Sequence, residues 1–235
     1  MSAPALPVVA VVDTGVDDAL ALLVAVRHPA LDLRGVICTG GNVALERVWA
    51  NTLYVLRLLG ADDVTVAAGA DRRLDGRAFP VRDVHGPDGL AGLGPLADAG
   101  PPPVSGEPAP VPPGAVVVSL GPLTALTSLG TVRVVASYAR PGEANHAMDP
   151  AAAAQVAVEH ADVPPHPMPG TRTVEALARS AGAGARLAAW LLRHQAARGA
   201  GLGDAAVVLR LAEPDLPPDE WAGRVVSLCH ERPLR

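Results

Sequence analysis

Lysine is absent from this chain of 235 residues, and all 19 of its basic residues are arginine. Because 24 residues are acidic, the net charge is −5, and no basic block gives nucleic-acid binding any electrostatic support. A phosphate-binding loop of the type that ends in lysine is excluded as well. We attribute the arginine bias to codon usage or lineage rather than to function.

Cysteine is equally scarce. Cys38 and Cys229 are too few for a disulfide framework, and their spacing fits no zinc motif, so we expect a reducing, cytoplasmic location. The first residues lack a basic segment ahead of their apolar run, so we expect no signal peptide. Since no apolar run reaches about 18 residues without a charge or a breaker, we also expect no membrane span.

Aromatic residues make up only 3% of the chain, whereas hydrophobic residues make up 49% and charged residues 18%. A chain of this composition can bury a sizeable core and is not expected to be disordered. We expect a single domain over residues 1–235, in which a polar network rather than aromatic side chains carries the function.

Apolar and amphipathic runs alternate along the first third of the chain. The apolar, β-branched runs at 6–12, 31–41 and 63–69 predict buried strands, and the runs at 17–28 and 44–60 predict helices. This order implies parallel strands joined by right-handed crossovers. We therefore predict an α/β fold with a mostly parallel central sheet, an open Rossmann-like sheet with helices on both faces.

A proline-rich segment interrupts this alternation. Residues 99–114 include seven prolines, which exclude a helix and predict an extended surface crossover. Order returns with the predicted strands that begin at 115 and 131. Helices are expected at 149–160, with Asp149 as N-cap, and over most of 173–199, with breaks at its glycines, while 204–214 suits a helix or a strand.

Three carboxylates, Asp13, Asp17 and Asp18, follow the first predicted strand in the segment VVDTGVDDA. Ligands of open parallel sheets bind at the carboxyl ends of strands, and Gly15 allows a turn that gathers these side chains there. Gathered carboxylates repel one another unless a cation lies among them, and oxygen ligands select a hard ion such as calcium or magnesium. A solvated turn that caps a helix is the alternative, and the spacing alone does not separate the two.

Four later segments bear on this choice. They are TGGNV (39–43), HGPDGL (85–90), GPLTA (121–125) and GEANHAMDPAAA (142–153). Together with the Asp cluster, and in this order, they resemble the nucleoside hydrolase family, the inosine–uridine-preferring ribohydrolases, over residues 7–98 and 115–160. The resemblance implies hydrolysis of the N-ribosidic bond of a nucleoside or nucleoside analogue, with Ca²⁺ as cofactor.

The resemblance also implies a metal site and a general base. Asp13, Asp18, the backbone carbonyl of Thr124 and Asp204 would hold the calcium ion, which would also bind a water and two ribose hydroxyls. Asp13 would take a proton from that water, whose pKa the metal lowers. Asp204 is assigned here because GLGDAA (201–206) resembles the late His-Asp-Pro segment of the family.

Four further residues are implied to contact the sugar. Asp17, Asn42, Glu143 and Asn145 would hydrogen-bond the ribose hydroxyls. The transition state would resemble an oxocarbenium ion, whose positive charge the surrounding carboxylates would stabilise.

The chain departs from the family pattern at several positions. Val11 and Ala125 replace an Asp and an Asn, and the late His that protonates the departing base in many members is Gly203. His85 is the obvious substitute acid. The chain is also shorter than typical members, and the proline-rich segment replaces what is usually a helix.

These departures leave two alternatives open beside hydrolysis. One is a divergent ribosyl-transferring enzyme, and the other is a non-catalytic protein that binds ribose or a partner on the same scaffold. The retained Asp13 favours catalysis, because binding alone needs no base. The expected partner is a small ribosylated molecule, and the resemblance also implies a homodimer or homotetramer.

Overall fold

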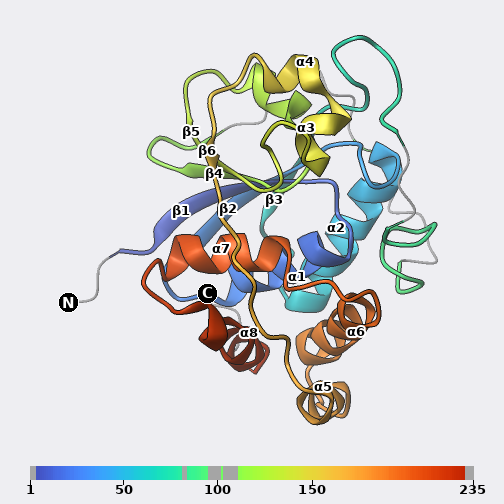
Figure 1. Cartoon of the computed structure of the whole chain (residues 1–235), viewed down its shortest axis with the longest axis vertical. Coiled ribbons are helices and arrows are strands. Elements are labelled where there is room, and N and C mark those ends of the chain that lie inside the picture. Colours follow the sequence, from blue (N-terminus) through green and yellow to red (C-terminus); the bar gives the residue numbers. More distant parts are fainter. Residues whose placement is uncertain (1–3, 81–83, 95–101, 103–110, 231–235) are drawn as a thin grey trace.

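A parallel sheet forms the centre of the protein (Figure 1). The computed structural model describes residues 4–80, 84–94, 102 and 111–230. The six strands run in the order β3-β2-β1-β4-β5-β6, and every pair of neighbours is parallel. Their bounds are β1 (Leu6–Val12), β2 (Leu31–Cys38), β3 (Thr65–Ala68), β4 (Val116–Ser119), β5 (Arg133–Ala136) and β6 (Glu159–His160). The predicted α/β fold is confirmed.

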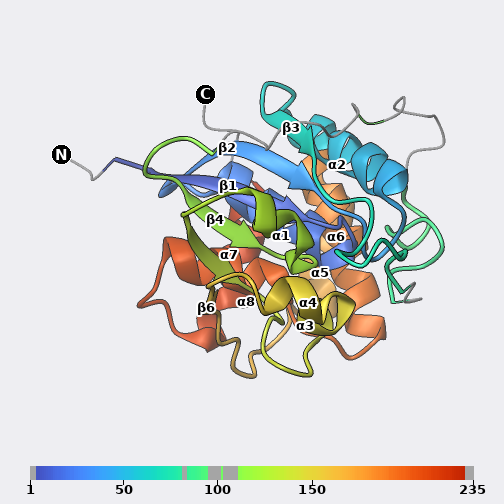
Figure 2. The same cartoon turned by 90° about the horizontal axis from the view of Figure 1, so that it is seen from above.

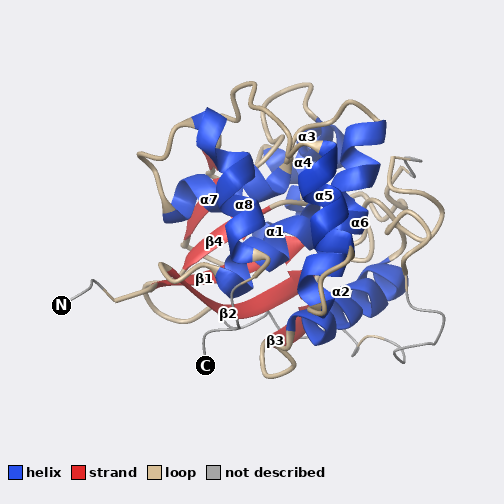
Figure 3. Cartoon of the chain, turned by 90° about the horizontal axis from the view of Figure 1, so that it is seen from below, coloured by secondary structure: helices blue, strands red, loops and turns tan. Residues whose placement is uncertain are grey.

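The helices lie on both faces of this sheet but cover them unequally. The α-helices are α1 (Val16–Arg27), α2 (Leu45–Leu59), α3 (Ala144–Met148), α4 (Pro150–Ala153), α5 (Thr171–Ala178), α6 (Ala183–Ala197), α7 (Asp204–Ala212) and α8 (Trp221–Leu228). Two 3-10 helices, η1 (Leu123–Ser128) and η2 (Pro218–Glu220), complete the set within the described ranges. Figure 3 shows α1, α2 and α5 to α8 gathered on one side of the strands.

Strand β1 is apolar on both sides because it lies between two cores. Val8, Ala10 and Val12 belong to the larger core beneath α1, α6, α7 and α8. The alternate residues Val9 and Val11 belong to a smaller core that η1 covers. The second face therefore carries only short helices, and in Figure 2, which looks onto that side, β1, β2 and β4 remain visible. A continuous apolar run is typical of a strand buried in this way.

The strand order places a topological switch beside β1. From β1 the chain moves outward through α1, β2, α2 and β3, and it then returns to the other side of β1 as β4. Helix α1, which connects β1 to β2, lies on the face of the larger core, whereas η1, which connects β4 to β5, lies on the face of the smaller core. They consequently diverge at the carboxyl ends of β1 and β4 and leave a crevice there.

Several predicted boundaries need correction. The predicted helix at 149–160 is wrong beyond its first turn, because α4 ends at Ala153 and residues 159–160 form the edge strand β6. The run at 173–199 is broken between α5 and α6, near Gly182, as its glycines predicted, and 204–212 is helical. Helix α8 was not predicted. Most of the proline-rich segment 99–114 lies outside the described residues. Among the described residues, no helix has the length and apolar character needed to cross a bilayer.

A buried histidine ties the end of α1 to the C-terminal helices. The Ala30 backbone N–H donates to His28 Nδ1, so Nε2 carries the proton and donates to Glu213 Oε1 at 2.8 Å. Arg224 Nε of α8 donates to the same oxygen at 2.8 Å. Burial opposes ionisation of Glu213, but these hydrogen bonds outweigh it and lower the pKa of Glu213 below its ordinary value of 4.5. The ionised carboxylate thus joins α1, α7 and α8.

Replacing Glu213 by Gln should lower the free energy of unfolding by about 1 kcal/mol at pH 7, because two charge-assisted hydrogen bonds weaken. The contribution of a carboxylate with a lowered pKa is complete above its unfolded-state pKa and is lost as pH falls through the folded-state value. The difference between native protein and Glu213→Gln should therefore shrink only below about pH 4.5. Urea unfolding from pH 7 to pH 4 measures it, with exposed Asp215→Asn as control. A pH-independent difference would contradict the assignment.

Candidate active site

Asp13 follows the last residue of β1 and is buried at the switch point. Its Oδ2 accepts a hydrogen bond of 2.7 Å from the Asn42 backbone N–H, which follows β2. Gly41 and Gly121 flank the carboxylate, and a Cβ at Gly121 would lie 2.9 Å from Asp13 Oδ1. Any side chain at these two positions would collide with Asp13. The two glycines therefore form a slot that fixes the carboxylate between the ends of β2 and β4.

The start of α1 presents Asp17 and Asp18 to the same crevice. Asp18 is buried, and its Oδ2 accepts from the Gly15 backbone N–H at 2.9 Å and from Asn42 Nδ2 at 3.5 Å. Asp17 is half-buried, with its Oδ1 at 3.6 Å from His85 Nε2. Acidic residues in a first helical turn are stabilised by the helix dipole. That stabilisation accounts for two adjacent carboxylates at this position, but not for their burial.

Asp204 reaches the site from the other end of the chain. It is the first residue of α7, which packs against α1, and its side chain is buried. One carboxylate oxygen each of Asp17, Asp18 and Asp204 lies within 4.8 Å of the other two. The packing of α7 on α1 therefore brings a residue some 190 positions away to the Asp cluster. Asp13 lies outside this trio but lines the same cavity.

The electrostatics of these carboxylates are unfavourable without a cation. Burial, and to a smaller extent the charge of Asp17, raise the pKa of Asp13 to about 7, although the hydrogen bond from the Asn42 backbone N–H opposes the shift. Burial is also the main reason why the pKa values of Asp18 and Asp204 are raised, and the charges that act on both are other carboxylates. The hydrogen bond from Ser137 partly offsets the effect at Asp204.

Two oxygens in the cluster support a metal ion rather than a solvated turn. Asp18 Oδ1 and Asp204 Oδ1 are buried and accept no hydrogen bond from any described residue. A buried carboxylate oxygen without a donor is costly, and a bound cation would remove that cost. The donor set consists of oxygen atoms alone, which suits calcium or magnesium. The residues present therefore fit a hard divalent cation.

His85 lies on a loop that is held in one conformation. Its Nδ1 accepts from the Val16 backbone N–H at 3.2 Å, so Nε2 carries the proton of the neutral ring and faces Asp17. Burial lowers the pKa of His85, Asp17 opposes this, and His194 and Arg198 lower it further. Asp88 closes the loop by accepting from the backbone N–H groups of Leu90, Gly92 and Gly94.

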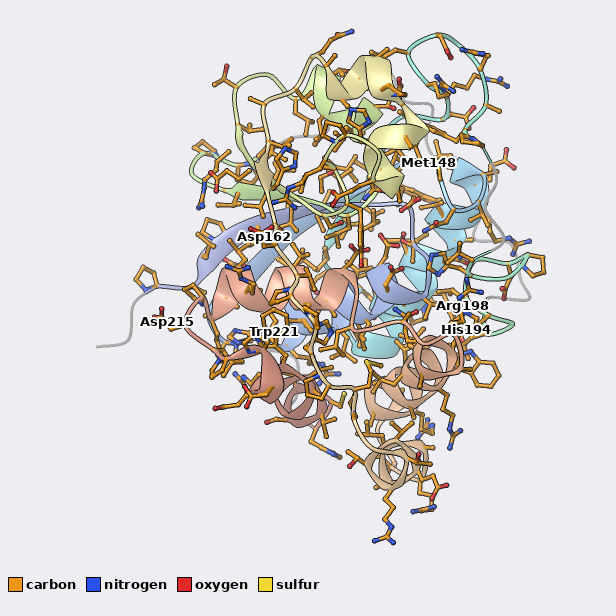
Figure 4. All side chains as sticks on the ribbon, in the orientation of Figure 1. Met148, Asp162, His194, Arg198, Asp215 and Trp221 are labelled. Carbon is orange, nitrogen blue, oxygen red and sulfur yellow. The ribbon has the colours of Figure 1, made fainter. Side chains whose placement is uncertain are left out.

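Helix α6 supports the same loop from outside. Trp190 Nε1 donates to the Leu90 carbonyl at 3.3 Å, and His194 Nε2 lies 3.3 Å from the Val84 carbonyl. Figure 4 shows His194 and Arg198 near the C-terminal end of α6, on the side of the molecule where this loop lies. The loop and the end of α6 together form one wall of the site.

Among the remaining predicted residues, two line the cavity and two do not. Asn42 and Asn145 both line it, and Asn145 Nδ2 donates to the carbonyls of Leu120 at 2.7 Å and Ser137 at 3.0 Å. Glu143 is not among the lining residues, and its Oε2 accepts from the Arg140 backbone N–H at 2.7 Å. Thr124 is not among them either, and its hydroxyl donates to Asp149 at 2.8 Å.

The cavity has a volume of about 290 Å³ and includes residues that the sequence analysis missed. Among them are Tyr138, Met148, Gln195 and Arg198. Tyr138 follows β5 by two residues and has a φ of 45°, so its position at the carboxyl edge was a usable signal. Gln195 and Arg198 come from α6 and the turn after it, and nothing in the strand pattern indicated which part of α6 would reach the site.

Gly203 cannot be replaced by histidine without strain. Its φ of 58° and ψ of −130° fall in a region that residues with a Cβ rarely adopt. A Cβ there would also lie 2.9 Å from Asp17 Cβ and 3.1 Å from Asp17 Oδ2. The backbone is thus shaped around a glycine, and Asp17 lies in the space where a side chain would begin.

The sequence model of the family described as inosine-uridine preferring nucleoside hydrolase matches residues 8–133, more than half of the chain. The chain belongs to this family. The matched part includes Asp13, Asp17, Asp18, Asn42 and His85. The resemblance inferred from the order of the motifs is confirmed.

Individual relatives align over a shorter part of this nucleoside hydrolase family member. An uncharacterized protein in the ribF 3′ region of Corynebacterium ammoniagenes is 50% identical over 82 residues, which are 33% of this chain and 85% of the relative. The pyrimidine-specific ribonucleoside hydrolase RihA of Photobacterium profundum is 38% identical over 86 residues, which are 37% of this chain and 28% of the relative. The chain thus aligns with less than a third of that curated hydrolase.

Solved structures match the fold over almost the whole chain. The plant nucleoside hydrolase PpNRh1 superposes with a TM-score of 0.74 and 22% identity, covering 96% of this chain and 98% of the other. The purine-preferring ribonucleoside hydrolase of Gardnerella vaginalis gives a TM-score of 0.70 and 18% identity, covering 95% and 99%. At these identities the likeness establishes the fold alone.

Replacing Asp204 by Asn should abolish most of the thermal stabilisation that calcium gives the native protein, because the amide removes one buried anionic ligand. Without metal, the variant should melt at the same temperature as the native protein or higher, since a buried like charge is gone. Thermal unfolding with a chelator, calcium or magnesium measures both effects. Asp215→Asn, remote from the site (Figure 4), is the matched control. A native protein that neither ion stabilises would contradict the metal assignment.

Replacing Gly203 by Ala should lower the free energy of unfolding by about 1–3 kcal/mol, since the backbone is strained for any Cβ and Asp17 must move. Gly223→Ala in α8 is the control, because no heavy atom lies within 4 Å of the added Cβ and alanine favours a helix. Urea unfolding of the native protein and of both variants measures the two changes in the free energy of unfolding. Equal stabilities would show that the site tolerates a side chain at Gly203.

Proposed function

We propose that this protein is a calcium-dependent N-ribohydrolase that cleaves the N-ribosidic bond of a ribonucleoside or a nucleoside analogue. The observation that carries the proposal is the cluster of Asp17, Asp18 and Asp204 beside a cavity that Asp13 also lines, in which two buried carboxylate oxygens have no hydrogen-bond donor among the described residues. Membership of the nucleoside hydrolase family supports the same activity.

Asp18 and Asp204 are the central residues of the proposed metal site. The family resemblance adds Asp13 and the Thr124 carbonyl as ligands, and the mutual distances favour Asp17 as a neighbour of the ion. Calcium, when bound, would lower the pKa of a coordinated water and hold vicinal ribose hydroxyls. The Thr124 carbonyl accepts from Thr127 Oγ1 at 2.8 Å, so its second lone pair is the one that would serve as a ligand.

Asp13 is the proposed general base. Its carboxylate is fixed by the glycine slot and by the Asn42 N–H, so it keeps one orientation toward the cavity. It would take a proton from the attacking water as the bond from C1′ to the base breaks and the bond from C1′ to the water oxygen forms. The clustered carboxylates would stabilise the positive charge that develops on the ribosyl ring.

The other polar residues are assigned to the sugar and to the departing base. Asp17, Asn42 and Asn145 line the cavity and would bind ribose hydroxyls, and Glu143 joins them on the family pattern alone. His85 presents Nε2–H and is the proposed donor to the departing base. Because Gly203 supplies no proton, a base that is already a good leaving group is favoured.

Ribose should be released from a panel of purine and pyrimidine ribonucleosides in the presence of calcium and not in the presence of a chelator. Asp13→Asn should reduce kcat by about 10²–10⁴-fold, because the amide cannot accept the proton. Reducing-sugar release measures this, with Asp215→Asn as the control that keeps its activity. Purine and pyrimidine substrates are both needed because the matched relatives carry names of both kinds.

Two other outcomes would redirect the proposal. Transfer of ribose to an added acceptor without release to water would favour the ribosyl-transferring alternative. Calcium-dependent stabilisation with neither release nor transfer would favour a ribose- or partner-binding protein. The expected homodimer or homotetramer stays a prediction that light scattering of the purified protein tests.

A further inference from the structure

One arginine side chain lines the acidic cavity together with Asp13, Asp17 and Asp204. Arg198 lies in the turn that follows α6, and its side chain is exposed to the cavity mouth. Among the residues that the structure describes, none forms an ion pair or a hydrogen bond with its guanidinium. Figure 4 shows it near His194 at the end of α6.

Arg198 acts electrostatically on the histidine that lines the same cavity. Its positive charge lowers the pKa of His85. Both residues line the cavity together with Asp13, Asp17 and Asp204.

An arginine of α6, in contrast, has hydrogen-bond partners within the protein. Arg186 donates to the backbone carbonyls of Ser180 and Ala181, so its charge is used within the protein. The neighbour of Arg198 on the same wall, His194, is engaged with the Val84 carbonyl. Arg198 alone among the charged residues lining the cavity is a cation with both terminal nitrogens open to a ligand, within the described part of the chain.

A substrate that enters the cavity removes water from this guanidinium. Desolvating a charge without giving it a partner is unfavourable, so a neutral ligand gains little or loses affinity there. A carboxylate or a phosphate, in contrast, matches the two parallel N–H groups of the fork. The carboxylates of the cavity would otherwise repel such a group, so the arginine among the lining residues is the side chain that can hold it.

We propose that Arg198 makes this site selective for ribonucleosides that carry an anionic group, a carboxylate on the base or a phosphate on the 5′ oxygen. The inference rests on the proposed ribohydrolase activity and names its substrate class. Ribose hydroxyls would occupy the carboxylate wall, and the anionic group would lie against Arg198. Arg198 is then a specificity-determining residue that touches the substrate away from the bond that breaks.

Matched substrates isolate this effect. Orotidine differs from uridine by one carboxylate on the base, and uridine 5′-monophosphate differs from it by one phosphate. The value of kcat/KM for sugar release is measured for all three with calcium, using the native protein, Arg198→Gln and Arg193→Gln. Arg193 is exposed on the same helix and does not line the cavity, so its variant controls for the loss of one positive charge.

The native protein should favour one anionic substrate over uridine by at least tenfold. That ratio should fall at least tenfold in Arg198→Gln and stay within twofold in Arg193→Gln. A preference for orotidine identifies a base carboxylate as the recognised group, and a preference for the monophosphate identifies the 5′ phosphate. Because Arg198 is exposed, the variant should keep the native melting temperature, which is measured in parallel.

Failure of the inference and failure of the proposed function give different results. Hydrolysis of uridine with no anionic preference, or with a preference that survives in Arg198→Gln, overturns the inference and leaves the hydrolase standing. No release from any substrate overturns the hydrolase. In that case, thermal shift in the presence of calcium measures the binding of the three compounds to the native protein and to Arg198→Gln. Binding of an anionic compound that is lost in Arg198→Gln supports the inference. Equal binding by both proteins overturns it.

Discussion

The concentration of negative charge at the carboxyl end of β1 is the constraint around which the site is arranged. Asp13, Asp18 and Asp204 are buried, and their main electrostatic neighbours are one another and Asp17. Burying like charges together opposes folding unless the charge is neutralised by protons or by a cation. A protein that serves only as a scaffold gains nothing from this arrangement, since apolar residues of similar volume would stabilise the same position.

The remaining architecture delivers and fixes these carboxylates. The strand order opens the crevice at β1 and β4, and glycines at the ends of β2 and β4 leave room for the Asp13 carboxylate. Packing of α7 on α1 supplies Asp204, while the hydrogen bonds of His28, Glu213 and Arg224 hold the ends of α1, α7 and α8 together. Hydrogen bonds at one end of α1 and α7 thus support the packing that brings Asp204 to Asp17 and Asp18 at the other end.

Local signals predicted this site where the residues follow strands. Asp13 and Asn42 come directly after β1 and after the end of β2, so the parallel sheet itself brings them together, and the order of motifs identified the family. The short helix α4 was overestimated because an alanine-rich run favours a helix in isolation, whereas here the chain leaves it to form the edge strand β6. Gln195 and Arg198 were missed because their place depends on how α6 packs, which no local pattern of α6 determines.

In the proposed reaction, Gly203, His85 and Arg198 all bear on how the base would depart. With a glycine whose φ is 58° and Asp17 against it, the backbone leaves no room for an acid at that position. His85 offers a single N–H, because Val16 occupies its other ring nitrogen. A cation beside this histidine lowers its pKa, so less of the ring is protonated near neutral pH, and the same cation would stabilise negative charge on the group that leaves. The wall is therefore better suited to a base that departs as an anion than to one that needs full protonation, because Arg198 would offset the negative charge that develops.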